Sequence, residues 1–296
     1  MTMNIRDLRY FLAVVKYKHF GKAAESCFVS QPTLSAQLKK MEEFLGVQLL
    51  ERSNKHVTIT PVGEAIAVRA QRIISETDDL IGYARSLQDP FSAEIRIGSI
   101  PTLGPYLLPH LIPTLRTQFP DLKLRLYEGQ THDVVKRLRD GALDMLVLAV
   151  PVDIEGLSSK VVFREPFYLA VPQEHPLASK SKVKVDQLKE IELLLLEDGH
   201  CLRQHAMEFC AWQAAADKQN FEATSLETLR NMVSAGAGIT MMPKLAVPAE
   251  STPSLTYIPF EKPEPGRDIA VVWRKETSLG VVIDAISEIL ASLFSK

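Results

Sequence analysis

A heptad seam between residues 60 and 88 is the feature of this 296-residue sequence that most constrains its fold. Residues 60–64 are typical of a helix start, because Pro61 is tolerated in a first turn. The apolar or small residues that follow alternate four and three positions apart; they are Ile66, Ala70, Ile73, Thr77, Leu80, Ala84 and Leu87. A seam this long needs a partner surface. We expect a second copy of the chain to supply it, in a homodimer or homotetramer; packing against its own chain is the alternative.

The residues before this helix predict three short helices and a hairpin. An apolar stripe at helical spacing predicts the first helix; it comprises Leu8, Phe11, Leu12 and Val15. Residues 22–28 predict the second helix, and Ser30 is placed to cap a third. The third helix buries one face, formed by Leu34, Leu38, Met41 and Leu45. Residues 49–52 and 57–60 predict the two strands of a wing, so we expect an all-α winged helix-turn-helix domain.

The polar face of the third helix and the wing predict contact with double-stranded DNA. Hydroxyl and amide side chains can meet base edges, and basic side chains suit phosphates. The candidate DNA-binding residues are Ser30, Gln31, Pro32, Thr33, Ser35, Gln37, Lys39, Arg52 and Lys55. Residues 1–72 hold 11 Lys and Arg against 6 Asp and Glu, whereas residues 73–296 hold 23 against 30. This asymmetry favours a nucleic-acid-binding part. The alternative is a three-helix domain with a solvated basic face.

Strands and helices alternate after the break at residues 89–92, which predicts an α/β fold with predominantly parallel strands. The expected strands are 94–100, 122–129, 145–150, 161–172, 193–196, 221–224, 238–243, 255–260 and 268–274. The expected helices include 106–119, 133–140 and 226–235. About 200 residues are long for one sheet, so we expect two Rossmann-like subdomains. Segments near 163–166 and 265–268 cross between them and leave a cleft.

Ligands of such sheets lie beyond the carboxyl ends of the strands. Thr102, Thr131 and Cys201 each follow an expected strand, so the two hydroxyl groups are expected near the thiol. An alternative role for both threonines is helix capping, because each precedes an expected helix. One residue can serve both roles.

Two of the three cysteines lie nine residues apart, at Cys201 and Cys210. His200 and Arg203 place positive charge near Cys201, and a helix start after Gly199 also favours a thiolate. Cys210 has apolar neighbours. On one helix the two are ~13 Å apart, whereas a disulfide needs Cα atoms ~5.5 Å apart. The spacing therefore permits a redox pair that forms only if the helix unwinds, or two unrelated buried thiols. Cys27, in the apolar second helix, is expected in the core.

Composition excludes several classes of protein. No apolar run approaches the ~20 residues of a membrane span, and residues 1–10 lack the apolar core of a signal peptide. We therefore expect a cytoplasmic protein without membrane contact. The seven histidines form no metal-ligand cluster and no Ser-His-Asp order. We expect no metal, no cofactor and no enzymatic role.

Residues 4–88 resemble the DNA-binding half of LysR-type transcriptional regulators. The matching residues are Phe20, Ala23, Ala24, Ser30, Gln31, Pro32, Leu34, Ser35, Leu45, Gly46, the run 49–52 and the run 60–63. The remainder resembles the two-lobed effector domain of that family, which is similar to periplasmic binding proteins. The resemblance implies a DNA-binding domain at 1–60, a linker and dimerisation helix at 61–89 and an effector domain at 90–296. Lobe I is expected at about 92–163 and 268–296, and lobe II at about 164–267.

Within that family the chain is similar to the members that sense hydrogen peroxide. The similar runs are 100–102, 104–110, 130–132, 196–203 and 223–233. This resemblance implies that Cys201 reacts with peroxide and that Cys210 resolves the product as a disulfide. It also implies a pocket lined by Thr102, Thr131, His200 and Arg203, with Arg267 beside it. Gln204 and Asn220 depart from the pattern of the better-known relative, where an acidic residue and a histidine stand.

The implied function is a regulator of oxidative-stress genes that binds promoter DNA and is switched by hydrogen peroxide. Its expected partners are RNA polymerase and a cellular dithiol reductant that resets the disulfide. Two alternatives remain open. One is a LysR-type regulator that binds a small metabolite in the effector cleft while the cysteines stay passive. The other is a thiol peroxidase-like enzyme joined to a DNA-binding domain.

Overall fold

The computed structural model describes residues 3–52, 57–86, 89–188, 193–199, 201–203, 222–250 and 254–294. By its contacts the chain divides into two compact units. The N-terminal unit comprises residues 1–85 together with 140–142, and the C-terminal unit comprises 86–139 and 143–296. Each unit is described separately below.

The N-terminal unit contains the three expected helices, which are α1 (Ile5–Tyr17), α2 (Phe20–Ser26) and α3 (Gln31–Leu45). Asn4 and Asp7 form a capping box at the start of α1. Ser30 caps α3 as predicted, because its Oγ accepts the backbone N–H of Thr33 at 3.3 Å. The apolar faces of the helices close one core, in which Phe11, Val14, Leu34, Leu38 and Met41 are buried.

A short wing and a long helix follow. The wing consists of β1 (Leu50–Arg52) and β2 (Val57–Ile59), which pair antiparallel. Helix α4 (Pro61–Ser86) begins where the Thr60 hydroxyl accepts the N–H of Gly63 at 2.9 Å and donates to the carbonyl of Gln48 at 2.8 Å. Gly63 has no room for a side chain, because a Cβ there would lie 2.3 Å from the Leu49 carbonyl oxygen.

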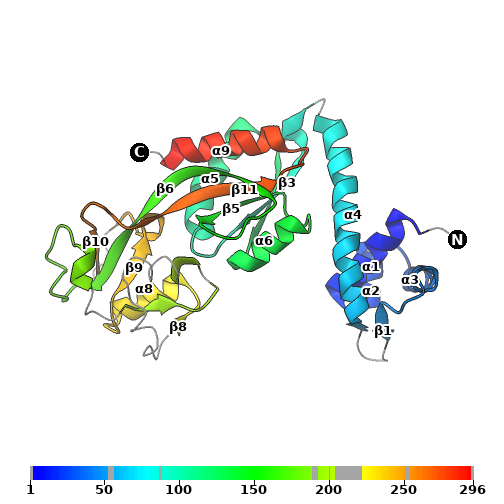
Figure 1. Ribbon diagram of the computed structural model, residues 1–296, viewed down its shortest axis with the longest axis horizontal. Helices are drawn as coiled ribbons and strands as arrows, with labels where there is room; N and C mark the ends of the chain where they lie inside the picture. Colours follow the sequence, from blue (N-terminus) through cyan, green and yellow to red (C-terminus); the bar gives the residue numbers. More distant parts are fainter. Residues whose placement is uncertain are drawn as a thin grey trace. The chain divides into compact units, whose positions relative to one another are not determined.

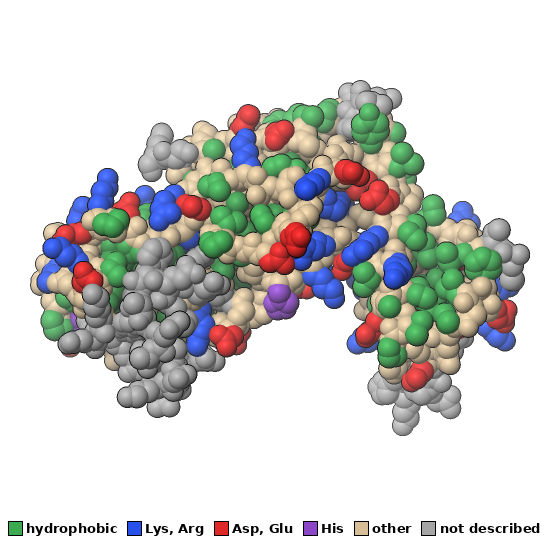
Figure 2. Space-filling model, viewed as in Figure 1, with side chains coloured by type: hydrophobic (Ala, Val, Ile, Leu, Met, Phe, Trp, Pro, Cys, Tyr) green, Lys and Arg blue, Asp and Glu red, His purple; other side chains and the backbone are tan. Residues whose placement is uncertain are grey.

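The heptad seam of α4 has two different environments. Of the seam residues, Ala70 is buried in the core of the N-terminal unit and Ile66 packs against that core, so the start of the helix packs on its own chain. Further along, Ile73 and Leu80 leave 46% and 69% of their surface exposed. Figure 2 shows hydrophobic side chains gathered on the visible face of this unit. The alternative of packing within the chain therefore holds for the first half, and the second half remains available for the predicted partner helix.

The C-terminal unit contains a seven-stranded sheet in the order β10-β6-β11-β5-β3-β4, with β9 also paired to β6. Its strands are β3 (Glu94–Ser99), β4 (Lys123–Glu128), β5 (Met145–Val150), β6 (Leu157–Pro172), β9 (Thr240–Pro243), β10 (Leu255–Pro259) and β11 (Gly266–Arg274). Strand β3 is parallel to β4 and β5, whereas β6 and β11 pair antiparallel with each of their neighbours. The expectation of predominantly parallel strands is wrong, because the long β6 and β11 run in opposite directions (Figure 1).

The remaining elements of this unit are α5 (Gly104–Gln118), α6 (Thr131–Arg139), α8 (Leu226–Ser234), α9 (Gly280–Phe294), the parallel pair β7 (Leu195–Leu196) and β8 (Glu222–Ala223), and the 3-10 turns η1 (Pro90–Ser92), η2 (Val185–Leu188) and η4 (Lys244–Ala246). Helices α9 and α6 lie on opposite faces of the sheet (Figure 1). Helix α9 is not among the expected helices, although its buried residues follow a helical period.

Two apolar cores divide this unit into lobes. Lobe I is the part built on β3, β4, β5, α5, α6 and α9; its core includes Ile97, Leu107, Val134, Val147, Val271 and Ile286. Lobe II is the part built on β7, β8, β9, β10 and α8; its core includes Phe167, Leu196, Leu229, Met242 and Ile258. Strand β6 contributes Phe163 to the first core and Phe167 to the second. The predicted architecture of two α/β subdomains is confirmed, while the exact boundaries at 60, 90, 163 and 268 stay a prediction.

No helix in the part of the chain that the structure describes combines the length and the apolar character needed to cross a membrane.

We expect Gly63→Ala to destabilise the N-terminal unit by about 1–3 kcal/mol, because the added methyl group overlaps the backbone of Leu49 and nothing flexible can give way. Urea unfolding followed by circular dichroism measures the change. Gly280→Ala is the matched control, because a Cβ at Gly280 meets nothing within 4 Å. Equal midpoints for the two variants would contradict the close approach.

Candidate functional site

Cys201 lies where the two lobes meet. The chain leaves β7 at Leu196, turns at 198–199 and begins a helical turn at Cys201. The partly buried side chain of Cys201 packs against the core of lobe I. The next residue, Leu202, is buried in the core of lobe II. The thiol is therefore held at the junction by a segment that is anchored in the other lobe.

The turn before Cys201 has a fixed conformation. Gly199 has φ of +96°, and a Cβ there would lie 2.8 Å from the side-chain oxygen of Gln130, so this position requires glycine. The Arg203 guanidinium donates to the Leu196 carbonyl at 3.0 Å and pairs with Asp198 at 3.0 Å. These contacts fold Arg203 back over the turn and hold the strand end, the turn and the first helical residues together.

A buried polar network lies beside the thiol. The Arg267 guanidinium donates from Nη1 to the Thr102 hydroxyl at 2.9 Å and from Nη2 to the Thr102 carbonyl at 2.8 Å. Its Nε donates to the Glu165 carboxylate at 2.8 Å. All three residues are at most 2% exposed. Thr102 is 165 positions from Arg267 in the sequence, so the fold alone brings them together.

Burial and charge act on the Cys201 thiol in opposite directions. Burial raises its pKa because the thiolate loses its hydration. The Arg267 cation, the Thr131 hydroxyl and the backbone N–H groups of Cys201 and Leu202 lower it. The net pKa lies above that of an ordinary thiol, so burial outweighs the groups that favour the thiolate. The expected cations were His200 and Arg203; His200 lies outside the described residues, and Arg267 is the charge with the largest effect on the thiol.

The two threonines do not act as helix caps. The N-cap position of α5 is Leu103, and it makes no side-chain cap, while the Thr102 hydroxyl is engaged by Arg267. The buried Thr131 hydroxyl has no partner with full hydrogen-bond geometry in the described part of the chain. It does lie close enough to Cys201 to stabilise the thiolate and lower that thiol's pKa. The structure therefore brings Thr102, Thr131, Arg267 and Cys201 together.

The other predicted site residues have different outcomes. His200 and Cys210 lie outside the described residues, as do the departures Gln204 and Asn220. Glu165 belongs to the network although nothing in the sequence analysis singles it out. Its signal was a carboxylate inside a strand in which Arg164 is the only other charged residue after residue 161.

Most of the predicted DNA-binding residues lie on α3 or cap it. Gln31, Pro32, Thr33 and Lys39 are exposed, and Ser35 and Gln37 are partly buried. The hydroxyls of Ser30 and Thr33 are hydrogen-bonded to each other at 2.8 Å. Lys55 and the side chain of Arg52 lie outside the described residues. The exposed amide of Gln31 and the ammonium of Lys39 are thus available to a ligand along this helix.

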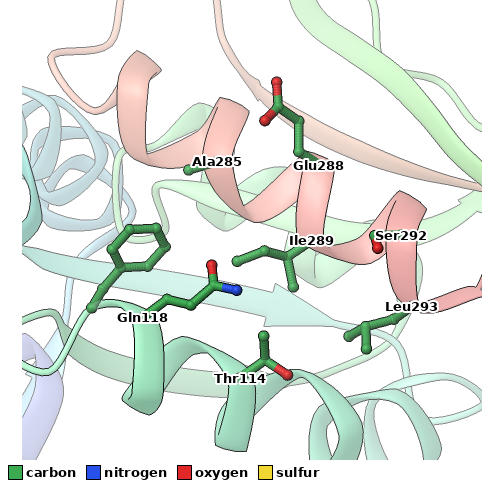
Figure 3. Close-up of a pocket in the computed structure, with 8 residues that line it drawn as sticks. Thr114, Gln118, Ala285, Glu288, Ile289, Ser292 and Leu293 are labelled. Atoms are coloured by element: carbon green, nitrogen blue, oxygen red, sulfur yellow. The ribbon is translucent and has the colours of Figure 1, made fainter.

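A separate hollow of about 290 Å³ lies between α5 and α9 (Figure 3). It is lined by Thr114, Gln118, Phe119, Ala285, Glu288, Ile289, Ser292 and Leu293. None of the residues of the Cys201 site lines it, so the hollow and the thiol are distinct features of lobe I.

Known proteins resemble this chain along almost its whole length. A Haemophilus influenzae protein called hydrogen peroxide-inducible genes activator is 46% identical over 94% of this chain and 92% of its own. Full-length OxyR from Pseudomonas aeruginosa, solved as a mutant, has a TM-score of 0.81 and 36% identity over 98% of this chain and 95% of its own. A Corynebacterium glutamicum OxyR mutant with bound hydrogen peroxide has a TM-score of 0.68 and 31% identity over 100% of this chain and 94% of its own.

Two family descriptions cover both units. Residues 5–64 match the bacterial regulatory helix-turn-helix protein of the lysR family, and residues 88–295 match the LysR substrate binding domain. The capped α3 with its exposed polar start and the two-lobed C-terminal unit are the structural counterparts of these matches. The chain therefore belongs to the LysR family of DNA-binding transcriptional regulators, which are not enzymes.

Proposed function

We propose that this protein is a transcriptional activator of oxidative-stress genes whose switch is the oxidation of Cys201 by hydrogen peroxide. The observation that carries the proposal is a thiol at the junction of the lobes with a buried guanidinium and an otherwise unpartnered hydroxyl beside it. The names of the relatives, a peroxide-inducible activator and a peroxide-bound OxyR, support the same reading. Thr102, Thr131, His200, Arg203 and Arg267 are the proposed pocket residues.

The proposed chemistry balances without a cofactor. The Cys201 thiolate attacks one oxygen of hydrogen peroxide, so that the S–O bond forms as the O–O bond breaks. The leaving hydroxide takes a proton and departs as water. Cationic and hydroxyl donors favour this step because they stabilise both the thiolate and the developing negative charge on the leaving oxygen. Arg267 and Thr131 are the proposed donors, because both favour the Cys201 thiolate.

The second step is a disulfide with Cys210. The Cys210 thiolate attacks the sulfenic sulfur, so that the S–S bond forms as the S–O bond breaks, and the displaced hydroxide takes a proton and leaves as water. A disulfide needs Cα atoms ~5.5 Å apart, so forming this bond fixes the distance between positions 201 and 210. Cys201 packs on lobe I, so its withdrawal changes the contact between the lobes. A cellular dithiol reverses the step by thiol–disulfide exchange.

The N-terminal unit is the proposed output of the switch. In this proposal the start of α3 enters the major groove of promoter DNA, with Gln31 at base edges and Lys39 at phosphates. The exposed second half of α4 is the proposed surface on which two copies pair. We also propose RNA polymerase as the partner through which the bound protein activates transcription.

One observation favours a second candidate function. The raised pKa of Cys201 leaves the thiol mostly protonated near neutral pH, which suits a passive cysteine beside a metabolite site. In that case the cleft of this effector domain takes a small ligand. A Cys201→Ser variant that still activates transcription in response to an inducer other than peroxide would favour this candidate.

Stoichiometric hydrogen peroxide is expected to link Cys201 to Cys210. Peptide mass analysis should find this linkage and leave Cys27 as a free thiol. Cys210→Ser should stop at the sulfenic acid, which dimedone traps, and Cys201→Ser should show neither product. Cys27→Ser is the matched control and should behave as the wild type. A linkage that includes Cys27, or none at all, would contradict the mechanism.

The rate of Cys201 oxidation by peroxide is expected to increase with pH and to keep increasing above ~8.5, the pKa of a free cysteine. The thiolate is the reactive form, and a raised pKa means that it is lost sooner as the pH falls. Dimedone trapping in Cys210→Ser over a series of pH values measures the profile. A rate that is already constant from pH 7 upward would show that the thiol is ionised after all.

Binding to a DNA duplex selected in vitro from random sequences is expected to depend on α3 in two ways. Gln31→Ala should weaken binding to the selected site by about 1–3 kcal/mol and leave binding to unrelated DNA unchanged. Lys39→Ala should weaken all duplexes alike and reduce the slope of log K against log salt by about one. Lys180→Ala, an exposed lysine of the other unit, is the charge-matched control. Equal losses of DNA affinity for the two lysine variants would show that Lys39 does not contact the DNA.

A further inference from the structure

Glu165 and Arg267 form a buried ion pair at the point where strands β6 and β11 pass between the lobes. The two residues are direct cross-strand partners, and their side chains are 1% and 0% exposed. Burying two charges costs so much hydration that such a pair seldom stabilises a fold more than apolar residues of the same volume. Stability alone therefore does not account for this carboxylate.

The two oxygens of Glu165 serve different elements. One accepts the Nε–H of Arg267 at 2.8 Å, and the other accepts the backbone N–H of Leu245, in η4, at 2.9 Å. Arg267 in turn donates to the hydroxyl and the carbonyl of Thr102, just before α5. A continuous line of hydrogen bonds thus runs from η4 through Glu165 and Arg267 to Thr102.

The local backbone keeps this pair in place. Gly266 approaches the neighbouring strand so closely that a Cβ there would lie 2.6 Å from the Glu165 carbonyl oxygen. With the guanidinium bonded through Nε and through both terminal nitrogens, Arg267 cannot rotate in its plane or swing away. Each terminal nitrogen keeps one further N–H, and the charge that these atoms carry is the one that favours the Cys201 thiolate.

We propose that Glu165 is a positioning residue for the Cys201 reaction: its carboxylate fixes the Arg267 guanidinium beside the sulfur and ties that guanidinium to η4. This inference rests on the proposed function, in which Cys201 is the reacting thiol. Glu165 does not touch the sulfur or the peroxide; it acts only through Arg267. Removing the carboxylate releases the guanidinium, and the thiol then keeps the burial that disfavours its ionisation but loses the cation that offsets it.

The amide of glutamine is the sharpest probe of this role, because it has nearly the shape of the carboxylate. A carboxylate accepts through both oxygens, whereas an amide offers one acceptor and one donor group. Glu165→Gln can therefore satisfy Arg267 or Leu245 but not both. Asp268→Asn is the matched control: Asp268 pairs with Arg164 at 3.0 Å on the same two strands, one position along, but faces solvent.

The experiment measures the pH dependence of Cys201 alkylation by iodoacetamide in the full-length protein, read by peptide mass analysis. The midpoint of the Glu165→Gln profile is expected to move up by about one pH unit, and that of Asp268→Asn to stay with the wild type. An unchanged midpoint, or one that moves down, would overturn the proposal, since the carboxylate would then be irrelevant or would only neutralise Arg267.

A double-variant comparison keeps the test decisive if Glu165→Gln fails to fold. The single variant Arg267→Gln is compared with the double variant that carries Glu165→Gln and Arg267→Gln. The double variant removes both charges and so leaves no lone buried charge. If Glu165 acts only through Arg267, the alkylation midpoint of the double variant lies at or below that of Arg267→Gln, in which the lone carboxylate further disfavours the thiolate. A higher midpoint in the double variant would overturn the proposal, since the carboxylate would then favour the thiolate without Arg267. Because no peroxide is used, this result is separate from the test of the proposed function, in which peroxide must link the two cysteines.

Discussion

The guanidinium of Arg267 is the group on which the junction of the lobes depends. The side chain extends from β11. Its Nε donates to Glu165 of β6, and its two terminal nitrogens donate to Thr102, just before α5. A buried guanidinium is tolerated only when its donors are satisfied, because an unpaired buried charge is strongly destabilising. The geometry of the junction is therefore determined by the planar fork of this one side chain, which lysine does not reproduce.

The same group explains why a largely buried thiol can be a reaction centre. A cysteine packed against the core of lobe I would by default be inert, because hydrocarbon disfavours the thiolate. Arg267, Thr131 and the backbone N–H groups at the start of a helical turn work against that tendency. The net pKa stays above the ordinary value, so these groups offset the effect of burial only in part.

Sequence reasoning succeeded where the cause is local and failed where it is not. Ser30 as the cap of α3 and the helical stripes of the N-terminal unit follow from a few neighbouring residues, and the structure confirms them. The direction in which β6 and β11 pair depends on which distant strand each one meets, and alternation of apolar residues does not encode that. Thr102 and Arg267 are 165 positions apart, so their contact was not visible in any local pattern. The resemblance to a family pointed to Arg267, but only the fold supplied its partners.

The hydrogen bonds made by Arg267 explain how a switch at this junction would work. In the thiol state Cys201 packs on lobe I while its neighbour Leu202 is fixed in lobe II, so the sulfur acts as a contact between the lobes. A change in the oxidation state of the sulfur changes the demand it makes on Arg267 and Thr131. Arg267 is bonded to Thr102 on one side and, through Glu165, to η4 on the other. In the proposed switch, a shift of that fork therefore acts both on Thr102 and on η4, whose Ala246 is buried in the core of lobe II.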